Sequence, residues 1–319
     1  MRVLVTGCSG FIGYSLTERL VDKGYNVYGL VRFISSSRKL VDGVQYIVGD
    51  LTDYFSIVRA LEISRPDIII HLGAITPVSE SFHQPRLYME VNYFGTINLV
   101  EATRKRVENL HLFIYASTSE VYGVQNDFPI RETATPKPDS PYAISKYASE
   151  NYLLNYMYRA YKFPVVVMRP FNTYGRALVG QKHFVIEKII TSMLEGKETI
   201  EMGNPEAVRD FMFREDHVDA YITVLESSLN SNKYEEIVGE VFNFCTGVGI
   251  SIRKVFEIIK ELIGWNGKVV WYRYSRPTDI PKLIGSFERA YYVLGWAPRY
   301  SIVDGLRRAI DEWKEVLSK

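Results

Sequence analysis

The sequence predicts an α/β fold in which a doubly wound parallel sheet carries a smaller, interleaved C-terminal α/β lobe. Over the first 175 residues, short β-branched runs alternate with longer stretches of helical periodicity. The short runs are apolar throughout, which indicates strands buried on both faces of a parallel sheet. A glycine-rich turn follows the first run, as expected where such a strand passes into a helix.

The expected elements can be placed in order along this half of the chain. The predicted strands cover 2–5, 26–31, 44–48, 68–72, 112–116 and 165–169. The predicted helices cover 11–23, 54–63, 87–106 and 143–161. Four prolines within 129–141 disfavour helix at the residues that precede them, so we expect a surface loop there.

The pattern loosens after Gly175. Helices are predicted over 184–195, 220–229 and 252–263, the last with Ser251 as N-cap and Gly264 as terminator. The run 241–245 resembles another buried parallel strand. We therefore expect a domain of residues 1–175 joined by 238–262, and a lobe made mainly from 176–319 that binds the substrate.

Composition narrows the class of protein. The 319 residues carry a net charge of +1, which favours neither nucleic acid nor an anionic membrane as partner. Cys8 and Cys245 match no zinc spacing, so we expect free thiols and no metal site. No signal peptide or apolar run of about 20 residues is present. We expect a soluble cytoplasmic protein.

The glycine turn predicts a dinucleotide-binding Rossmann site. Its glycines allow a tight turn, close approach of the backbone to a diphosphate and close packing of helix on strand, while the helix N-terminus supplies amide donors. A purely structural turn is the alternative. The residues expected to contact the cofactor here are Gly7, Ser9, Gly10, Phe11, Ile12 and Gly13.

The end of the second strand bears on the choice of cofactor. This strand end carries Arg32, and Ser35 follows closely in sequence. In NAD-binding sites an acidic residue at this position hydrogen-bonds the ribose 2′-hydroxyl. An arginine suits a 2′-phosphate, so NADP is favoured and NAD stays possible; an ordinary solvated arginine is the alternative. Asp50 could bind the adenine amine or cap the next helix. Further cofactor contacts are expected from Leu51, Leu72, Gly73, Ala74, Ser117, Tyr142 and Lys146.

Tyr142 and Lys146 lie four residues apart on the helix that begins near Ser140, so they share one face. Tyr158 and Lys162 have the same spacing but lie a helix length from the strand that ends at Ser117 and Thr118. A phenol acts as a base near neutrality only if its pKa falls by roughly three units, about 4 kcal/mol. Lys146 could supply this in a cleft that excludes water.

Ser117 or Thr118 would then hold the same substrate hydroxyl, unless these side chains only satisfy backbone groups at the strand end.

These motifs resemble the extended short-chain dehydrogenase/reductases that act on nucleotide sugars. The resemblance rests on 6–13, on Thr118 with Tyr142 and Lys146, and on 169–175, and it covers essentially the whole chain. Within that family, 117–123 is similar to the Thr-Ser-Glu signature of GDP-mannose 4,6-dehydratases. Residues 276–286 resemble both that dehydratase and the GDP-4-keto-6-deoxymannose reductases.

The resemblance implies a catalytic set of Thr118, Ser119, Glu120, Tyr142 and Lys146. Glu120 would remove the C5 proton after C4 is oxidised, water would leave from C6, and hydride would return to C6. An ion pair with Arg131 is the alternative for Glu120. Ribose and diphosphate oxygens would be held by Asn172, Lys188, Arg209 and Arg276.

Three other readings stay open. A C4 epimerase of UDP-hexoses or a 4-keto reductase would keep the fold without needing Glu120, and a dinucleotide-binding scaffold or redox sensor would need neither Tyr142 nor Lys146. The resemblance also implies a homodimer, in which helices 87–106 and 143–161 form a four-helix interface.

Overall fold

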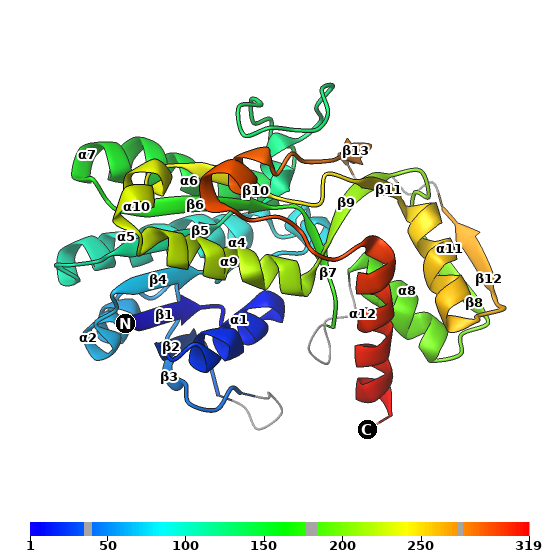
Figure 1. The fold of residues 1–319 in the computed structure, drawn as a ribbon, viewed down its shortest axis with the longest axis horizontal. Helices are drawn as coiled ribbons and strands as arrows, with labels where there is room; N and C mark the ends of the chain where they lie inside the picture. The colour runs from blue at the N-terminus through cyan, green and yellow to red at the C-terminus, as the bar shows by residue number, and fades with distance from the viewer. Residues whose placement is uncertain (35–39, 177–183, 273–276, 319) are drawn as a thin grey trace.

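The computed structural model describes residues 1–34, 40–176, 184–272 and 277–318. A seven-stranded sheet in the order β10-β6-β5-β4-β1-β2-β3 lies at its centre, and all neighbouring strands are parallel (Figure 1). This confirms the predicted doubly wound sheet. Its strands are β1 (Arg2–Thr6), β2 (Asn26–Val31), β3 (Gln45–Val48), β4 (Ile68–His71), β5 (Leu112–Ala116), β6 (Val165–Pro170) and β10 (Val241–Phe244).

Helices cover both faces of this sheet. The core on one face is closed by α1 (Phe11–Asp22), α9 (Arg214–Ser228), α10 (Ser231–Ile237) and the π-helical turn η4 (Ala290–Leu294). The core on the other is closed by α2 (Tyr54–Ser64), α5 (Gly95–Arg106) and η3 (Tyr152–Tyr158). Because successive strand residues point to opposite faces, Val3 and Val5 enter the first core and Leu4 the second.

The two long helices predicted at 87–106 and 143–161 each contain a π-helical turn. The first comprises α4 (Pro85–Tyr88), η1 (Met89–Phe94) and α5, after the short α3 (Val78–Ser81). The second comprises α6 (Pro141–Asn151), η3 and α7 (Arg159–Tyr161). Asn92 of η1 donates to Ser145 Oγ at 3.1 Å and to Ile75 O at 3.0 Å, so η1 is joined to the helix that carries Tyr142.

The second lobe has its own core. In Figure 1 it lies at the right, where α8 (Val185–Leu194), α11 (Ile252–Ile263) and α12 (Ile302–Leu317) gather around short strands. One group of strands is β7 (Asn172–Tyr174), β9 (Val208–Phe213), β11 (Gly249–Ser251) and β13 (Lys282–Leu283). The other is β8 (Thr199–Met202) with β12 (Lys268–Trp271).

The chain passes between the lobes more often than the sequence indicated. β10 pairs with β6 and so completes the central sheet. Helix α11 lies within the expected returning segment 238–262 but packs in the second core. Helix α9 lies within 176–319 but packs on α1. It begins at Arg214 and not near residue 220, because its first turn is polar and acidic and the apolar pattern starts later.

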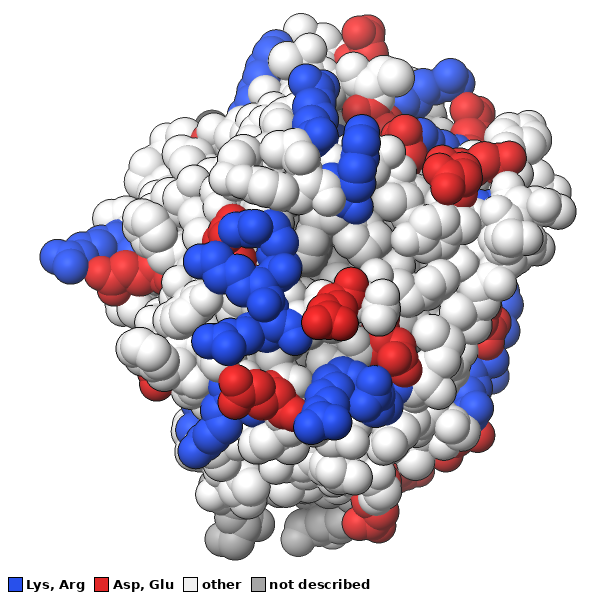
Figure 2. Space-filling model, turned by 90° about the vertical axis from the view of Figure 1, so that its left-hand side faces the viewer, with Lys and Arg blue, Asp and Glu red and all other residues white. Residues whose placement is uncertain are grey.

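Charges on the molecule are mixed. Figure 2 shows one face, on which groups of Lys and Arg lie beside Asp and Glu side chains. Within the described ranges no helix is both long and apolar enough to cross a membrane. The same ranges contain no cluster of three or more His, Cys, Asp or Glu placed to hold a metal ion.

A buried carboxylate joins three segments where the lobes meet. Asp210 on β9 is fully buried and accepts from Thr246 N at 2.8 Å, Thr246 Oγ1 at 2.6 Å and Gly247 N at 2.9 Å. Gly285 N, which follows β13, donates to the same carboxylate at 3.3 Å. One side chain therefore holds the end of β10 and the segment after β13 against β9.

We expect Asp210→Ala to lower the free energy of unfolding by about 3 kcal/mol, because buried donors on both segments lose their acceptor. Urea denaturation measures this value. Asp311→Ala on α12 is the control, since Asp311 is 74% exposed and lies 3.4 Å from Lys314. It should cost less than about 1 kcal/mol. Equal losses in both variants would show that Asp210 does not join the lobes.

Candidate active site

The glycine turn between β1 and α1 has the geometry of a diphosphate cradle. Gly7 has a φ of 70°, and a Cβ on it would lie 2.8 Å from Gly73 N. A Cβ on Gly13 would overlap the Gly7 carbonyl group. Gly10 caps α1 without a side-chain hydrogen bond, so the amides of the first turn stay available to an anion. These features fit a dinucleotide.

The other predicted cofactor residues follow the carboxyl ends of neighbouring strands. Gly73 N donates to Thr6 Oγ1 at 3.0 Å, which joins the ends of β1 and β4 beside Leu72 and Ala74. A Cβ on Gly73 would lie 2.8 Å from Leu51 Cδ1. Ser9 and Ile12 lie in the cradle and in the first turn of α1, while Phe11 tilts against Phe184 of the second lobe with ring centroids 6.3 Å apart.

At the adenine end of the predicted cofactor site, the sequence left two roles open for Asp50, which were adenine binding and capping of the next helix. Asp50 accepts from Thr52 N and Thr52 Oγ1, both at 2.8 Å, whereas Asp53 caps α2 by accepting from Phe55 N at 3.0 Å. Asp50 is therefore not the cap of that helix. Arg32 is exposed at the end of β2, and Ser35 lies outside the described residues.

Helix α6, which carries Tyr142 and Lys146, starts beside the end of β5. Ser140 caps α6 by accepting from Ala143 N at 3.1 Å, which sets Tyr142 in the first turn. Thr118 hydrogen-bonds the Tyr142 phenol and also accepts from Glu120 N at 3.2 Å. Burial raises the pKa of Tyr142, the Thr118 hydrogen bond lowers it, and the nearby Glu120 raises it. The structure therefore brings Thr118, Glu120 and Tyr142 together.

Two predictions about this strand end can be refined. Ser119 is buried as the first residue of η2 (Ser119–Tyr122), the 3₁₀ turn that carries Glu120. Arg131, the alternative partner for Glu120, forms an ion pair with Glu288 at 3.0 Å.

Lys146 lies one helical turn beyond Tyr142 and is buried. Its Nζ lies 4.3 Å from the centroid of the Tyr115 ring. Burial lowers the pKa of Lys146 to about 7, and the Glu150 carboxylate opposes that fall. The ammonium is therefore close to losing its proton under neutral conditions. In the other Tyr and Lys pair, Lys162 Nζ lies 5.7 Å from the centroid of the Tyr158 ring, where α7 ends.

A buried polar network that sequence did not reveal lies behind this site. Ser117 Oγ donates to Glu150, which Arg169 holds with two hydrogen bonds, of 3.0 Å from Nε and 2.5 Å from Nη2. Arg169 Nη1 donates to Tyr122 OH at 3.0 Å, and that hydroxyl donates to Asn243 Oδ1 at 2.7 Å. Ser117 is thus engaged with Glu150, whereas Thr118 contacts Tyr142.

The predicted substrate residues are spread over the second lobe. Asn172 begins β7, and its Oδ1 is buried without a hydrogen-bond partner in the structure, which suits a donor from a ligand. Lys188 Nζ donates to Glu201 O of β8 at 2.7 Å. Arg209 lies 3.5 Å from Asp279, and Arg276 lies outside the described residues.

Arg209 also lies near the start of α6. Burial and the nearby Asp279 raise the pKa of Asp139, and Arg209 lowers it. Thr278 Oγ1 donates to Asp139 O at 2.8 Å, directly before the Ser140 cap. The loop that carries Asp279 is therefore joined to the helix of Tyr142.

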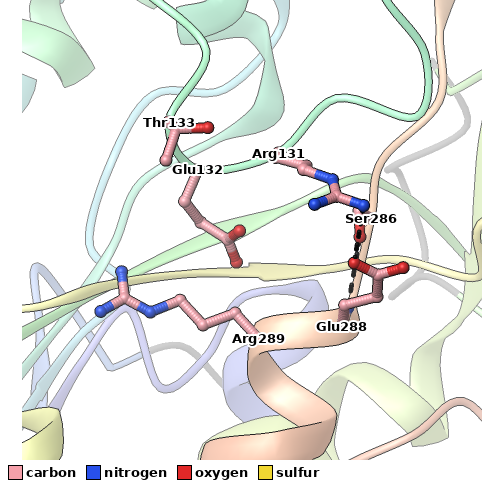
Figure 3. Close-up of a pocket in the computed structure, with 6 residues that line it drawn as sticks. All are labelled: Arg131, Glu132, Thr133, Ser286, Glu288 and Arg289. Atoms are coloured by element: carbon pink, nitrogen blue, oxygen red, sulfur yellow. Dashed lines mark hydrogen bonds and ion pairs between the residues drawn. The ribbon is translucent and has the colours of Figure 1, made fainter.

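A cavity of about 400 Å³ lies at the far end of the network (Figure 3). Glu132 lines it, and its carboxylate accepts from Asn243 N at 2.8 Å. None of the residues predicted for cofactor or substrate lines it, so we do not assign it to the reaction. The lining residues are Arg131, Glu132, Thr133, Ser286, Glu288 and Arg289.

Comparison with known sequences shows which protein family the chain is similar to. The family model described as GDP-mannose 4,6 dehydratase matches residues 4–309. The chain is 31% identical to dTDP-D-glucose 4,6-dehydratase of Homo sapiens, covering 98% of the chain and 90% of that protein. It is 32% identical to GDP-6-deoxy-D-talose 4-dehydrogenase of Aggregatibacter actinomycetemcomitans, covering 95% of the chain and 94% of that protein.

Solved structures agree with this assignment. UDP-glucose 4-epimerase of Thermotoga maritima with UDP-glucose has a TM-score of 0.90 at 30% identity, over 99% of the chain and 100% of that structure. The Thermus thermophilus UDP-glucose 4-epimerase complex with NAD has a TM-score of 0.86 at 29% identity, over 98% and 99%. RMD from Pseudomonas aeruginosa with NADPH has a TM-score of 0.82 at 28% identity, over 99% and 100%.

The match runs from the glycine cradle to the last helix, and it includes the strand end and helix that carry Thr118, Tyr142 and Lys146. The chain belongs to the extended short-chain dehydrogenase/reductase family of nucleotide-sugar epimerases and dehydratases.

Proposed function

We propose that this protein is an NAD(P)-dependent nucleotide-hexose 4,6-dehydratase that acts on GDP-mannose. The observation that carries the proposal is the place of Glu120, whose carboxylate lies close enough to Tyr142 to raise the pKa of its phenol, next to Thr118. A carboxylate at this position gives the site a second base. Proton removal from a carbon beside a carbonyl needs such a base, whereas oxidation of an alcohol needs only the tyrosine.

The residues divide the reaction between them. Tyr142 takes the proton of the C4 hydroxyl, while Thr118 holds the oxygen and the Lys146 ammonium offsets the negative charge on the phenol. A bound nicotinamide cofactor supplies the hydride acceptor at C4 and later the hydride donor at C6. Glu120 then removes the C5 proton, which the C4 carbonyl has acidified, and this proton departs with the C6 hydroxyl as water. After hydride is returned to C6, C5 regains a proton, which balances the one that Tyr142 took from the C4 hydroxyl. The glycine cradle and Arg32 would hold the cofactor.

GDP-mannose is proposed on two grounds. The matching family model carries the name of that dehydratase, and residues 276–286 resemble the GDP-sugar branch. We propose that Asn172 and Arg209 contact ribose and diphosphate oxygens; this is supported by the unpartnered acceptor of Asn172 and by the charge of Arg209 near Asp139, which precedes α6. These contacts are common to all nucleotide sugars, so the choice of guanine as the nucleotide base rests on the family model and on residues 276–286.

C4 epimerisation is the second candidate, because the Thermotoga maritima epimerase matches the whole chain with a TM-score of 0.90. That reaction would use Thr118, Tyr142 and Lys146 and leave Glu120 without a role.

With GDP-mannose and NADP⁺, the protein should form a product lighter by one water, detected by mass spectrometry. Glu120→Gln should lower kcat roughly 10²- to 10⁴-fold, because the amide cannot take the C5 proton. Parallel incubations with UDP-glucose and dTDP-glucose test which nucleotide base the protein prefers. Glu288→Gln, which alters an exposed ion pair with Arg131, should keep the activity of the unaltered protein. A C4 epimer as product, with full activity in Glu120→Gln, would establish the second candidate.

We further propose NADP as the preferred cofactor, because Arg32 follows β2 where a carboxylate would suit NAD. Arg32→Ala should weaken NADPH binding about 10- to 100-fold, through loss of a charged hydrogen bond worth roughly 1.5–3 kcal/mol. Binding of NADH should change less than about threefold, since it lacks the 2′-phosphate. Fluorescence titration gives both constants. Equal losses for both cofactors would place Arg32 away from the phosphate.

A homodimer through the two long helices is also proposed. Large apolar side chains on these helices are exposed, among them Phe94 at 53%, Ile144 at 45% and Tyr156 at 42%. A second copy of the same helices would bury them in a four-helix arrangement.

Light scattering should give the mass of a dimer for the unaltered protein. Phe94→Glu should shift it to the monomer of 36.7 kDa, because the interface cannot bury a carboxylate. Phe55→Glu is the matched control, since Phe55 is 82% exposed on α2. A monomer before any substitution would refute this interface.

A further inference from the structure

Lys146 is surrounded by groups that can compensate its charge to very different degrees. Tyr115 of β5 presents its ring at 4.3 Å, and burial raises the pKa of its phenol well above the usual range. His71 of β4 is held between Thr6 and Thr96, and burial lowers its pKa to about 3. Tyr142 on the same helix has a raised pKa. Tyr115 and His71 are therefore neutral near pH 7, and Tyr142 is the group whose negative charge Lys146 has to offset in the proposed reaction.

Glu150 differs because it is a carboxylate in an ion pair with the Arg169 guanidinium. It lies one helical turn beyond Lys146, so both side chains leave the same face of α6. It is 1% exposed, and Arg169 beside it is 4% exposed. Among the described residues, Glu150 is the carboxylate that acts on the charge of Lys146.

The position of the Glu150 carboxylate is fixed from two sides. Arg169 of β6 binds both of its oxygens, and Ser117 at the end of β5 donates to one of them. Ser117 directly precedes Thr118, which contacts Tyr142. The carboxylate therefore has a defined location relative to the reacting hydroxyls, and it cannot turn toward solvent.

The buried charges of Glu150, Arg169 and Lys146 have to balance one another. With Glu150 ionised, the buried cations Arg169 and Lys146 share one anion between them. Without it, two cations would remain in a site that excludes water, and Lys146 is the one that can release a proton, since a guanidinium stays charged. The carboxylate therefore decides whether Lys146 carries its charge.

We propose that Glu150 is a positioning residue, whose carboxylate, held by Arg169 and Ser117, keeps Lys146 protonated so that Tyr142 can act as the base. The inference rests on the proposed function, but it applies to any reaction of this family that needs Tyr142 to accept a proton. Glu150 does not touch substrate in this role and acts through Lys146.

The direct test is an NMR titration of ¹³C-labelled lysines in the protein without substrate, with Lys146→Met to assign the signal. Glu150→Gln should lower the pKa of Lys146 by about one unit or more, the usual effect of an opposite charge close by. Glu150→Asp keeps the charge and should lower it less. An unchanged Lys146 pKa in Glu150→Gln would overturn the proposal.

Glu150→Gln also leaves Arg169 without its partner, so it can fail to fold. In that case the double variant Glu150→Gln, Arg169→Met removes both buried charges and serves the same titration. Its Lys146 pKa should lie below that of the unaltered protein. A value equal to or above it would overturn the proposal.

The pH profile of kcat gives a second readout. Because Lys146 must be charged, activity falls as pH rises through its pKa, and this limb should move to lower pH by about one unit in Glu150→Gln. Glu215→Gln removes another arginine-paired carboxylate, 3.0 Å from Arg19, and should leave the limb in place. A purely structural role would lower the melting temperature without moving the limb.

The role proposed for Glu150 and the proposed reaction are refuted by different results. A shifted Lys146 titration in a protein that does not dehydrate GDP-mannose would refute the proposed reaction and retain the role of Glu150.

Discussion

The bidentate ion pair of Glu150 with Arg169 is the interaction on which the candidate site depends. It joins α6 to β6, and Ser117 extends it to the end of β5. Through Tyr122 and Asn243 it reaches β10, the strand that returns from the second half of the chain. A buried pair of this kind is costly to break because one charge is then left without a partner. The helix that carries Tyr142 and Lys146 therefore has one position relative to the strand that carries Thr118.

The second lobe is tied to the same region by a different carboxylate. Asp210 holds the segments after β10 and β13, and Thr278 donates to Asp139 directly before the cap of α6. Residues expected to hold the nucleotide are thus connected through short contacts to the start of the helix that carries Tyr142 and Lys146. Because Asp139 and Asp279 both face Arg209, a diphosphate that binds this arginine must compete with carboxylates that already compensate its charge.

Local signals predicted much of this molecule, because periodicity, the glycine turn and the Ser140 cap act over a few residues. The strands of the central sheet and the adjacency of Thr118 and Tyr142 followed from them. Features that depend on distant pairs did not. No local pattern in the sequence pairs Glu150 with Arg169, which lie 19 residues apart, and only the fold shows that they meet. The polar first turn of α9 concealed its start, and Asp53 rather than Asp50 proved to be the cap of α2.

Glu120 creates a difficulty that the rest of the site must solve. Burial raises the pKa of Tyr142 and the nearby Glu120 carboxylate raises it further, so the two bases of the proposed dehydratase reaction oppose each other. Burial also lowers the pKa of Lys146 to about 7. Without Glu120, a partly protonated Lys146 would have to offset only the negative charge of the phenolate. With Glu120 beside it, Lys146 has two negative groups to offset. The Glu150 carboxylate is therefore most needed in the proposed reaction that uses both bases, because it preserves the positive charge of Lys146 that offsets them.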